Sequence, residues 1–271
     1  MEKGSERGSV LITGAASGIG QAAARLFASH GYTVWALDRD PVTPEEGILP
    51  LTCDVTDAEG LRAVYERLAA EGVTLRAILP IAGIHRMISL VESSAASIRR
   101  LTEVNLIGTM LTVQAFHPLL APRGRVVIVT SEVATYDPLP FNGLYTVTKN
   151  ALECYAQALR QEIGLLGQHV VTVRPGAVAT PITDGTVMGA FELANSTSLY
   201  LREAHRFTDL TERFQGKPIT PEALAPTILR AATARRPRLS YARHRHPGLI
   251  LLSALPKRLQ CAIVRGLLHR R

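Results

Sequence analysis

The chain has 271 residues, of which 46% are hydrophobic, so enough apolar surface exists to exclude a disordered polymer. This length is typical of a single α/β domain. The net charge of +7 arises at the C-terminus, because residues 235–271 hold ten Lys or Arg and no acidic residue. The rest of the chain has 20 basic and 23 acidic residues, a net charge of −3. This balance argues against a nucleic-acid-binding face on the folded body.

From residue 9 onward, short β-branched or apolar runs alternate with longer segments of helical periodicity. This alternation is typical of βαβ units and predicts an α/β fold, a doubly wound parallel sheet. The predicted strands are Ser9–Thr13, Thr33–Leu37, Ile48–Thr52, Leu75–Pro80, Arg125–Thr130, His169–Arg174 and Arg238–Tyr241. The predicted helices are Gly18–His30, Asp57–Glu71, Ser93–Leu120, Tyr145–Leu166 and Pro221–Ala234.

The order of these elements indicates one domain over residues 9–242, because no repeat and no Pro/Gly-rich linker divides it. Residues 243–271 follow as a basic helical extension, and residues 1–8 are expected to fray. The stretch from Pro181 to Pro218 breaks the alternation late in the chain. Because ligand loops of doubly wound folds lie outside the carboxyl ends of the strands, this stretch is predicted to form a substrate lid.

A glycine-rich turn, TGAASGIG, follows the first predicted strand. Its glycines allow the backbone to approach a pyrophosphate, and the helix that starts there presents free N–H groups to the negative charge. A glycine-rich turn also occurs as a simple tight turn, so the neighbouring motifs must show whether this one binds a phosphate. The residues expected to contact the phosphates are Gly14, Ser17, Gly18, Ile19 and Gly20.

The second predicted strand leads into Asp38, 18 residues after Gly20. A carboxylate at this position can accept both hydroxyls of an adenosine ribose, which favours NAD and repels the 2′-phosphate of NADP. Arg39 is the contrary observation, because a guanidinium could pair with that phosphate. The alternative for Arg39 is a solvated loop arginine.

The ends of the third and fourth predicted strands add further cofactor contacts. Cys53-Asp54-Val55 would bring the Asp54 carboxylate near the adenine amino group, with Val55 beside it. A helix N-cap ahead of Asp57 is the alternative for Asp54. Ala82 and Gly83 are small enough to let a cofactor lie against the backbone, although close packing explains them as well.

Tyr145 and Lys149 are four residues apart in a predicted helix, so their side chains share one face. A phenol with an ordinary pKa of about 10 is a poor base at neutral pH. A nearby ammonium group is expected to stabilise the phenolate and lower that pKa. In isolation a Tyr–Lys pair is usually a surface pair, and its position after a dinucleotide cradle argues for proton transfer.

Together, these motifs resemble the short-chain dehydrogenase/reductase family. The resemblance covers residues 8–240 and rests on TGAASGIG, Asp38, Cys53-Asp54-Val55, Val104-Asn105, Thr130-Ser131, Tyr145-x-x-x-Lys149 and the segment RPGAVAT at 174–180. It implies a Rossmann fold and an NAD(P)-dependent oxidoreductase.

The resemblance also implies individual roles. Asn105 would interrupt its helix and hold a water that links Lys149 to solvent as a proton relay. Ser131 would orient and polarise the substrate oxygen. The nicotinamide end would lie after the sixth strand, in a turn shaped by Pro175 and Gly176 and held by Thr180 and the backbone around Val178.

The chain departs from the family pattern at two places. Pro80-Ile81-Ala82-Gly83 stands where the family has Asn-Asn-Ala-Gly, so the usual amide hydrogen bonds are absent. The family's serine precedes its tyrosine by about thirteen residues, an offset that falls on Glu132, whereas Ser131 lies fourteen back. We choose Ser131, because an ionised carboxylate would oppose developing alkoxide charge. Glu132 in the serine position would impair the enzyme.

The C-terminal residues 248–271 combine arginines with apolar residues at helical spacing. This pattern predicts packing on the same chain or on a second subunit, or contact with a membrane surface. His244 and His246 lie among arginines, so no metal site is expected. The three cysteines show no pairing or metal-ligand spacing, and no signal peptide is evident, so we expect a cytoplasmic protein. We also expect a homodimer or homotetramer that binds no nucleic acid.

The interpretation that best fits these residues is hydride transfer between NAD(H) and a secondary alcohol or ketone. A membrane contact of the basic tail would suit a lipophilic substrate, such as a steroid-, retinoid- or acyl-like alcohol, and the tail resembles those of family branches that act on such molecules. The alternatives are a carbonyl reductase that prefers NADP, and a catalytically impaired dinucleotide-binding sensor or scaffold that docks through its basic tail.

Overall fold

A computed structural model describes residues 7–180, 193–195, 197–214 and 217–269. Its centre is a seven-stranded sheet in the order β3-β2-β1-β4-β5-β6-β7, in which all neighbouring strands are parallel. The strands are β1 (Ser9–Thr13), β2 (Thr33–Asp38), β3 (Ile48–Thr52), β4 (Leu75–Leu79), β5 (Leu120–Val129), β6 (His169–Pro175) and β7 (Ser240–Arg243). The strand order reverses between β1 and β4, which is where doubly wound folds bind their ligands.

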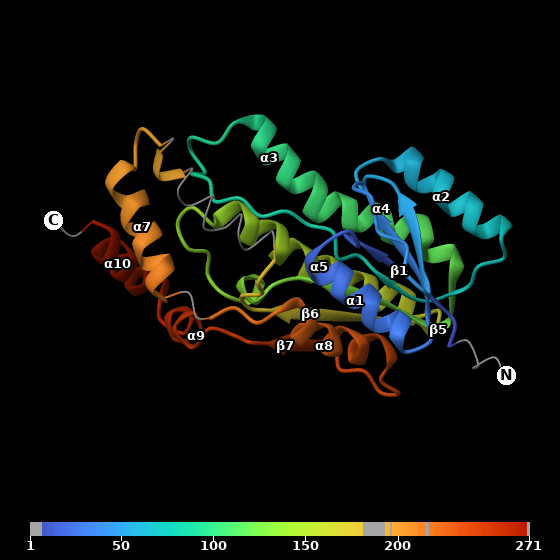
Figure 1. The fold of residues 1–271 in the computed structure, drawn as a ribbon. Helices are drawn as coiled ribbons and strands as arrows, with labels where there is room; N and C mark the ends of the chain where they lie inside the picture. The colour runs from blue at the N-terminus through green and yellow to red at the C-terminus, as the bar shows by residue number, and fades with distance from the viewer. Residues whose placement is uncertain (1–6, 181–192, 196, 215–216, 270–271) are drawn as a thin grey trace.

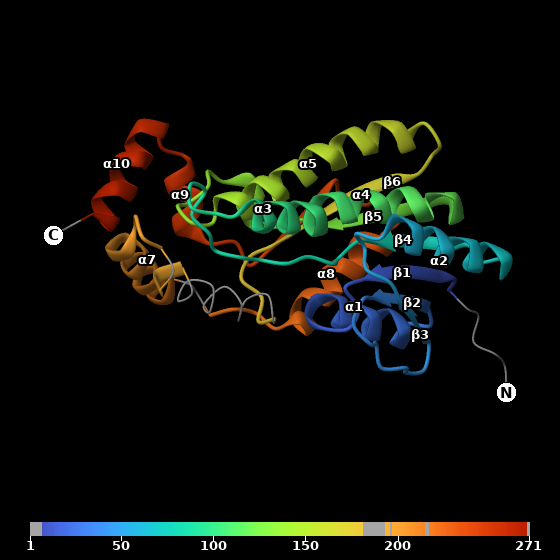
Figure 2. The same cartoon turned by 90° about the horizontal axis from the view of Figure 1, so that it is seen from above.

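Helices cover both faces of the sheet (Figures 1 and 2). One face carries α1 (Gly18–Ser29) and α8 (Pro221–Thr233), and the other carries α2 (Ala58–Ala70), α4 (Gly108–Phe116) and α5 (Gly143–Gly164). Alternate residues of each central strand point into one of two apolar clusters. This double burial explains the nearly continuous apolar runs of β1, β4 and β5. The doubly wound parallel sheet predicted from the sequence is confirmed.

The segment predicted as one helix over Ser93–Leu120 is divided in the structure. It contains α3 (Ala95–Thr102), a π-helical turn η1 (Glu103–Ile107), α4, and a short 3-10 turn η2 (His117–Leu119). β5 then begins at Leu120, which pairs with Leu75 of β4. The predicted helix is present over Ala95–Leu119, and the π turn that holds Asn105 is the local interruption that the family resemblance implied.

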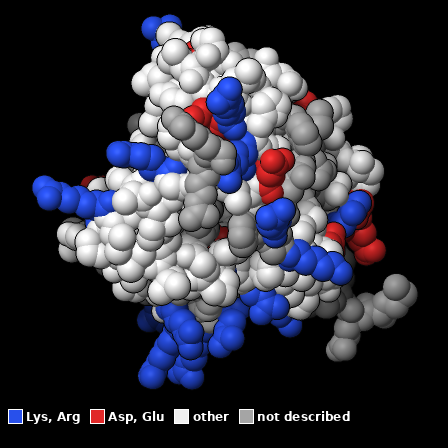
Figure 3. All heavy atoms as spheres, turned by 90° about the vertical axis from the view of Figure 1, so that its left-hand side faces the viewer, with Lys and Arg blue, Asp and Glu red and all other residues white. Residues whose placement is uncertain are grey.

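The C-terminal third builds a small helical layer at the carboxyl end of the sheet (Figures 1 and 2). It consists of α7 (Leu201–Phe214), α9 (Pro247–Ser253) and α10 (Lys257–Leu268), with α7 packed on α10. Helix α7 lies inside the 181–218 stretch, which we predicted to form a substrate lid. Residues 181–192, 196 and 215–216 of that stretch lie outside the described residues. Lys and Arg dominate the charged surface at this end of the molecule (Figure 3).

None of the helices in the described part of the chain is long and apolar enough to cross a membrane.

Candidate active site

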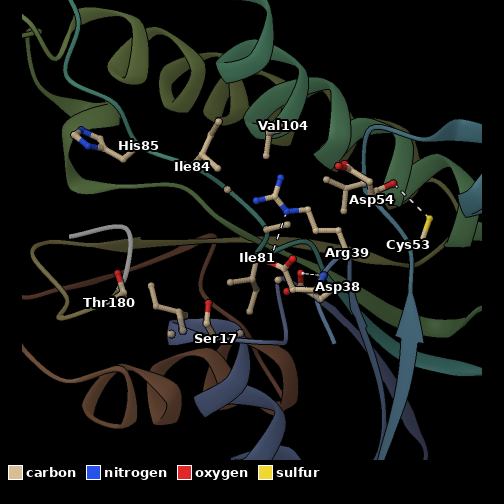
Figure 4. A pocket seen from close by; sticks show the side chains of 18 of the residues that line it. Ser17, Asp38, Arg39, Cys53, Asp54, Ile81, Ile84, His85, Val104 and Thr180 are labelled. Atoms are coloured by element: carbon tan, nitrogen blue, oxygen red, sulfur yellow. Dashed lines mark hydrogen bonds and ion pairs between the residues drawn. The ribbon is translucent and has the colours of Figure 1, made fainter. Parts of the chain in front are cut away.

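A cavity of about 350 Å³ opens at the carboxyl ends of β1 to β4. Its wall comes from the turns that follow these strands, and Figure 4 shows Asp38 and Arg39 toward one end and His85 and Thr180 toward the other. The lining includes most of the residues expected to contact the cofactor: Gly14, Ser17, Gly18, Ile19, Gly20, Asp38, Arg39, Asp54, Val55, Ala82, Gly83 and Thr180. The topology therefore gathers segments far apart in the sequence around one elongated pocket.

The backbone of the glycine turn is packed so closely at Gly14 and Gly20 that neither position has room for a side chain. An ideal Cβ on Gly20 would lie 2.0 Å from the carbonyl oxygen of Gly14. Gly14 has a φ of +70°, and a Cβ there would lie 2.9 Å from the backbone of Ala82. Helix α1 begins at Gly18, within this turn, and the residues of its first turn line the cavity. Such a backbone cradle at a helix N-terminus fits a pyrophosphate.

The Asp38 carboxylate connects the end of β2 to the glycine turn. One oxygen accepts the N–H of Ala16 at 2.9 Å, and the other accepts the N–H of Asp40 at 3.0 Å. A carboxylate has further acceptor capacity, which two ribose hydroxyls could use. The neighbouring Arg39 is half exposed and lies 3.7 Å from the Asp40 carboxylate.

Asp54 is not the N-cap of the next helix. That role belongs to Asp57, whose carboxylate accepts the N–H of Gly60 at 3.0 Å. Burial favours the neutral form of Asp54, but hydrogen bonds from the N–H and hydroxyl of Thr56 and the guanidinium of Arg100 outweigh it and lower the pKa. Asp54 is therefore a fixed anion on the cavity wall.

The turn after β4 is held without the asparagines of the family pattern. The hydroxyl oxygen of Thr13 accepts the N–H groups of Ile81 and Ala82, both at 3.1 Å. The fully buried Asn105 accepts the N–H of Ile84 at 2.8 Å and donates to the carbonyl of Ile84 at 2.9 Å. Thr13 and these contacts of Asn105 were not foreseen from the sequence, although the interruption of the helix at Asn105 corresponds to η1.

Tyr145 and Lys149 lie in the first two turns of α5, and the Lys149 Nζ atom is 5.8 Å from the centre of the Tyr145 ring. Lys149 is buried and donates to the carbonyl of Val129 at 3.2 Å. Burial lowers the pKa of Lys149 to about 8, and it raises the pKa of Tyr145 to about 12 against the opposing hydrogen bond with Ser131. We expected the pKa of Tyr145 to be lowered, and this expectation was wrong. Burial destabilises the phenolate more than the hydrogen bond with Ser131 stabilises it.

The two candidates for the serine position make different contacts. Ser131 hydrogen-bonds Tyr145, and its Oγ also accepts the N–H of Val133 at 3.4 Å. Glu132, in the 3-10 turn η3 (Glu132–Thr135), instead accepts the backbone N–H of His246 at 2.6 Å. Burial raises the pKa of Glu132, although His246 and nearby Arg245 oppose this shift. The arrangement therefore brings Ser131, and not Glu132, to the tyrosine.

His85 was missed by the sequence analysis. Its ring packs edge-on against Tyr145 with centroids 4.5 Å apart, and its Nε2 atom lies 2.8 Å from the Asn142 Oδ1 atom. Burial lowers the pKa of His85, and the charge of Lys149 lowers it further, despite the Asn142 contact. No local motif marks a lone histidine on a loop, so only the fold places it at the site.

The turn after β6 closes the far side of the site. Gly176 donates its N–H to the carbonyl of Arg243 at 2.8 Å, and Val178 forms a bridge with Ile219. Pro175 ends β6, and Thr180 is buried on the cavity wall. These residues therefore line the same cavity as Tyr145.

A second, larger cavity of about 700 Å³ begins where the first one ends. Its wall is mostly apolar and includes α7, α9 and α10, with Met87, Leu139, Phe207, Leu249, Leu252 and Ile263 among the lining residues. Ser131, Tyr145 and Lys149 also face it, and both cavities share Ile19, Ile81, Gly83, Ile84, His85 and Thr180. The predicted tail thus packs on its own chain over the site, whereas contact with a second subunit or a membrane stays a prediction.

Within the described ranges, no three His, Cys, Asp or Glu side chains gather as they would to hold a metal ion. The polar side chains that line the site, Ser131, Tyr145 and Lys149 among them, can donate hydrogen bonds and exchange protons.

The family model for short chain dehydrogenases matches residues 9–188. Three curated relatives are also similar. "Probable oxidoreductase EphD" of Mycobacterium tuberculosis is 32% identical over 189 residues, which cover 65% of this chain and 32% of that protein. 3-Ketodihydrosphingosine reductase of Bacteroides thetaiotaomicron is 25% identical and covers 84% of both chains. Human 17-beta-hydroxysteroid dehydrogenase type 1 is 29% identical, covering 86% of this chain and 76% of the relative. The chain thus spans about a third of the length of EphD.

Solved structures share the fold. A short chain dehydrogenase from Mycobacterium paratuberculosis bound to NAD has a TM-score of 0.72 and 24% identity, and the match covers 87% of this chain and 95% of that one. A short-chain dehydrogenase from Streptomyces avermitilis has a TM-score of 0.73 and 22% identity, with 96% and 95% covered. Because the family model matches more than half of the chain, this protein belongs to the short chain dehydrogenase family of nicotinamide-dependent oxidoreductases.

Proposed function

We propose that the protein interconverts a lipophilic secondary alcohol and its ketone with NAD as the redox partner. The observation that carries this proposal is the meeting of two cavities along His85 and Thr180, one with a phosphate cradle and one with an apolar wall that includes Tyr145. A dinucleotide in the first cavity and an apolar substrate in the second would converge on the same phenol.

The residues present fit a nicotinamide dinucleotide. The backbone of Gly14 to Gly20 would hold its phosphates, and the Asp38 carboxylate would accept its adenosine ribose hydroxyls. When bound, this cofactor exchanges hydride directly with the substrate carbon. A second phosphate on that ribose would face the Asp38 charge, and this repulsion supports NAD over NADP. Arg39 offers a weaker opposing contribution, because it is half exposed and pairs with Asp40.

Tyr145 moves the proton. With its pKa raised to about 12, the phenol stays protonated at neutral pH and can donate to an alkoxide that forms from a ketone. Ser131 hydrogen-bonds Tyr145 and would hold the substrate oxygen next to it. Lys149 presents a buried cation near the ring, which favours the phenolate once the proton has left.

The apolar wall supports a lipophilic substrate class. Its residues come from the loops after β4 and β5 and from α7, α9 and α10, and the polar groups converge at one end. A cavity of this kind buries an apolar body and orients one oxygen. Two relatives are named for a sphinganine ketone and for hydroxysteroids, which are lipophilic molecules of this class.

A substrate panel tests the proposal. Purified protein is incubated with NAD or NADP and a series of steroid, long-chain and small secondary alcohols, or with the reduced cofactors and the matching ketones. The absorbance of reduced nicotinamide is followed. We expect turnover with NAD that increases with the apolar size of the alcohol and that Ser131→Ala reduces by about a hundredfold or more. Equal rates for small and large alcohols would contradict the substrate class, and a lack of turnover in both directions would contradict the proposed activity.

A further inference from the structure

Glu132 is a buried carboxylate next to Ser131, and its side chain bonds the segment that precedes α9. Only 7% of its surface is exposed, and one oxygen accepts the His246 backbone N–H at 2.6 Å across 114 residues of sequence. Hydrogen bonds from an N–H to an ionised acceptor are among the stronger ones in proteins. This contact connects the loop after β5 to the start of the C-terminal helices.

The other end of the same short turn holds the neighbouring residue. The Nε atom of Arg245 donates to the Tyr136 hydroxyl at 2.8 Å, and the Arg245 guanidinium lies over the Tyr136 ring at 5.0 Å from its centre. A further bond joins Arg245 to the Thr135 hydroxyl at 3.4 Å. Both residues that precede α9 are therefore fixed by the turn that starts at Glu132.

The backbone in this region leaves no room for a shift toward β6. An ideal Cβ on Gly176 would lie 1.8 Å from the carbonyl oxygen of His244 and 3.0 Å from Glu132 Oε1. The segment 244–246 is thus held between the Gly176 turn and the Glu132 turn.

His246 determines where α9 begins. It is the N-cap of that helix, and its Nδ1 atom accepts the N–H of Leu249 at 3.3 Å. Helices α9 and α10 then place Leu249, Leu252 and Ile263 on the wall of the apolar cavity. We call residues 246–268, which supply this part of the cavity wall, the roof. Because His246 is the first residue of the roof, a contact that holds His246 in place also sets the position of α9.

We propose that Glu132 is a positioning residue that seats the roof over Ser131 and Tyr145 and thereby sets the preference for large apolar substrates. It does not touch the reacting atoms in this arrangement, because its carboxylate is engaged by the roof. Its neighbour Ser131 belongs to the same turn, so the position of the roof and that of the serine are coupled. This inference rests on the proposed function for the substrate class, but the seating of the roof can be measured without turnover.

Hydrogen exchange of the full chain, followed by mass spectrometry, tests the seating directly. In Glu132→Ala we expect the amides of residues 246–253 to exchange about tenfold faster or more, because the acceptor of the His246 N–H is gone, while β4 to β6 keep their protection. Glu132→Gln keeps an acceptor oxygen and should restore most of this protection. Glu46→Ala, a change of an exposed glutamate remote from the roof, is the matched control and should leave exchange unchanged.

Steady-state kinetics test the consequence. For Glu132→Ala we expect a rise of about tenfold in the KM of a long-chain secondary alcohol, with kcat within about threefold and the Kd of NAD unchanged. If Glu132→Ala does not fold, Glu132→Asp should produce a smaller loss of protection at the same amides, because its shorter side chain weakens the bond to the His246 N–H. Unchanged exchange at 246–253 in these variants would overturn the proposal. If the wild-type protein turns over no alcohol, the exchange result still decides the seating, and only the proposed function fails.

Discussion

Replacing Lys149 by methionine should stabilise the protein at neutral pH while removing its activity. Burial lowers the pKa of this lysine from 10.5 to about 8. Each tenfold change in proton affinity is worth about 1.4 kcal/mol, so keeping the ammonium buried at pH 7 costs the folded state about 3 kcal/mol. Methionine loses the hydrogen bond to the Val129 carbonyl, worth about 1 kcal/mol. The expected net gain in unfolding free energy is about 2 kcal/mol.

The gain has a defined pH dependence. The folded-state pKa is depressed, so between about pH 8 and 10.5 the unfolded chain keeps the proton that the folded chain has released. The stability of the wild type therefore rises with pH in this window, and the advantage of Lys149→Met shrinks toward zero.

Urea unfolding without nicotinamide measures this effect, with the fluorescence of Trp35 as the probe, since this buried residue is the chain's only tryptophan. Curves at pH 7 and pH 9.5 are compared for the wild type, Lys149→Met and the exposed control Lys217→Met. The control should differ from the wild type by no more than about 0.5 kcal/mol at both pH values. A Lys149→Met protein that is less stable than the wild type at pH 7, or a difference that does not change with pH, would refute the argument.

Three further changes give separate expectations. Gly20→Ala should destabilise the protein by about 3 kcal/mol or more and abolish dinucleotide binding, because its Cβ would collide with the backbone. In the same urea assay, the control Gly164→Ala should stabilise the protein by up to about 1 kcal/mol, because the space around Gly164 is open. Asp38→Ser should reduce the ratio of NAD to NADP affinity by about tenfold or more in paired fluorescence titrations, and an unchanged ratio would remove Asp38 from cofactor choice. His85→Ala should lower kcat by roughly tenfold through loss of the ring that packs on Tyr145, with the Kd of NAD unchanged; an unaltered kcat would leave His85 without a positioning role.

The sequence allows prediction of those features whose physical cause is local. Strand and helix periodicity predicted the sheet, and the glycine turn was recognised because only glycine fits a backbone approach such as that of Gly20. The spacing of Tyr145 and Lys149 placed both on one helix face because α5 spans them. In each case the residues that interact are close in sequence or occupy a fixed place after a strand.

Features that depend on distant contacts were not predictable in this way. Glu132 and His246 are 114 residues apart, and nothing in either neighbourhood indicates the other. The direction of the Tyr145 pKa depends on burial by the whole fold, so the expected effect of Lys149 alone gave the wrong sign. Helix α7 was missed because it lies in a polar stretch whose apolar face is covered by residues distant in sequence, such as Phe141 and those of α10.

The most direct test of the account is the comparison of Tyr145→Phe with the wild type in two assays on the same preparations. One assay measures turnover of the best lipophilic alcohol from the panel with NAD, and the other measures the Kd of NAD by titration. The account predicts that turnover falls by about a thousandfold or more while the Kd changes by less than about threefold, because the hydroxyl moves the proton and the cradle holds the dinucleotide. A Tyr145→Phe protein with full turnover would contradict the account.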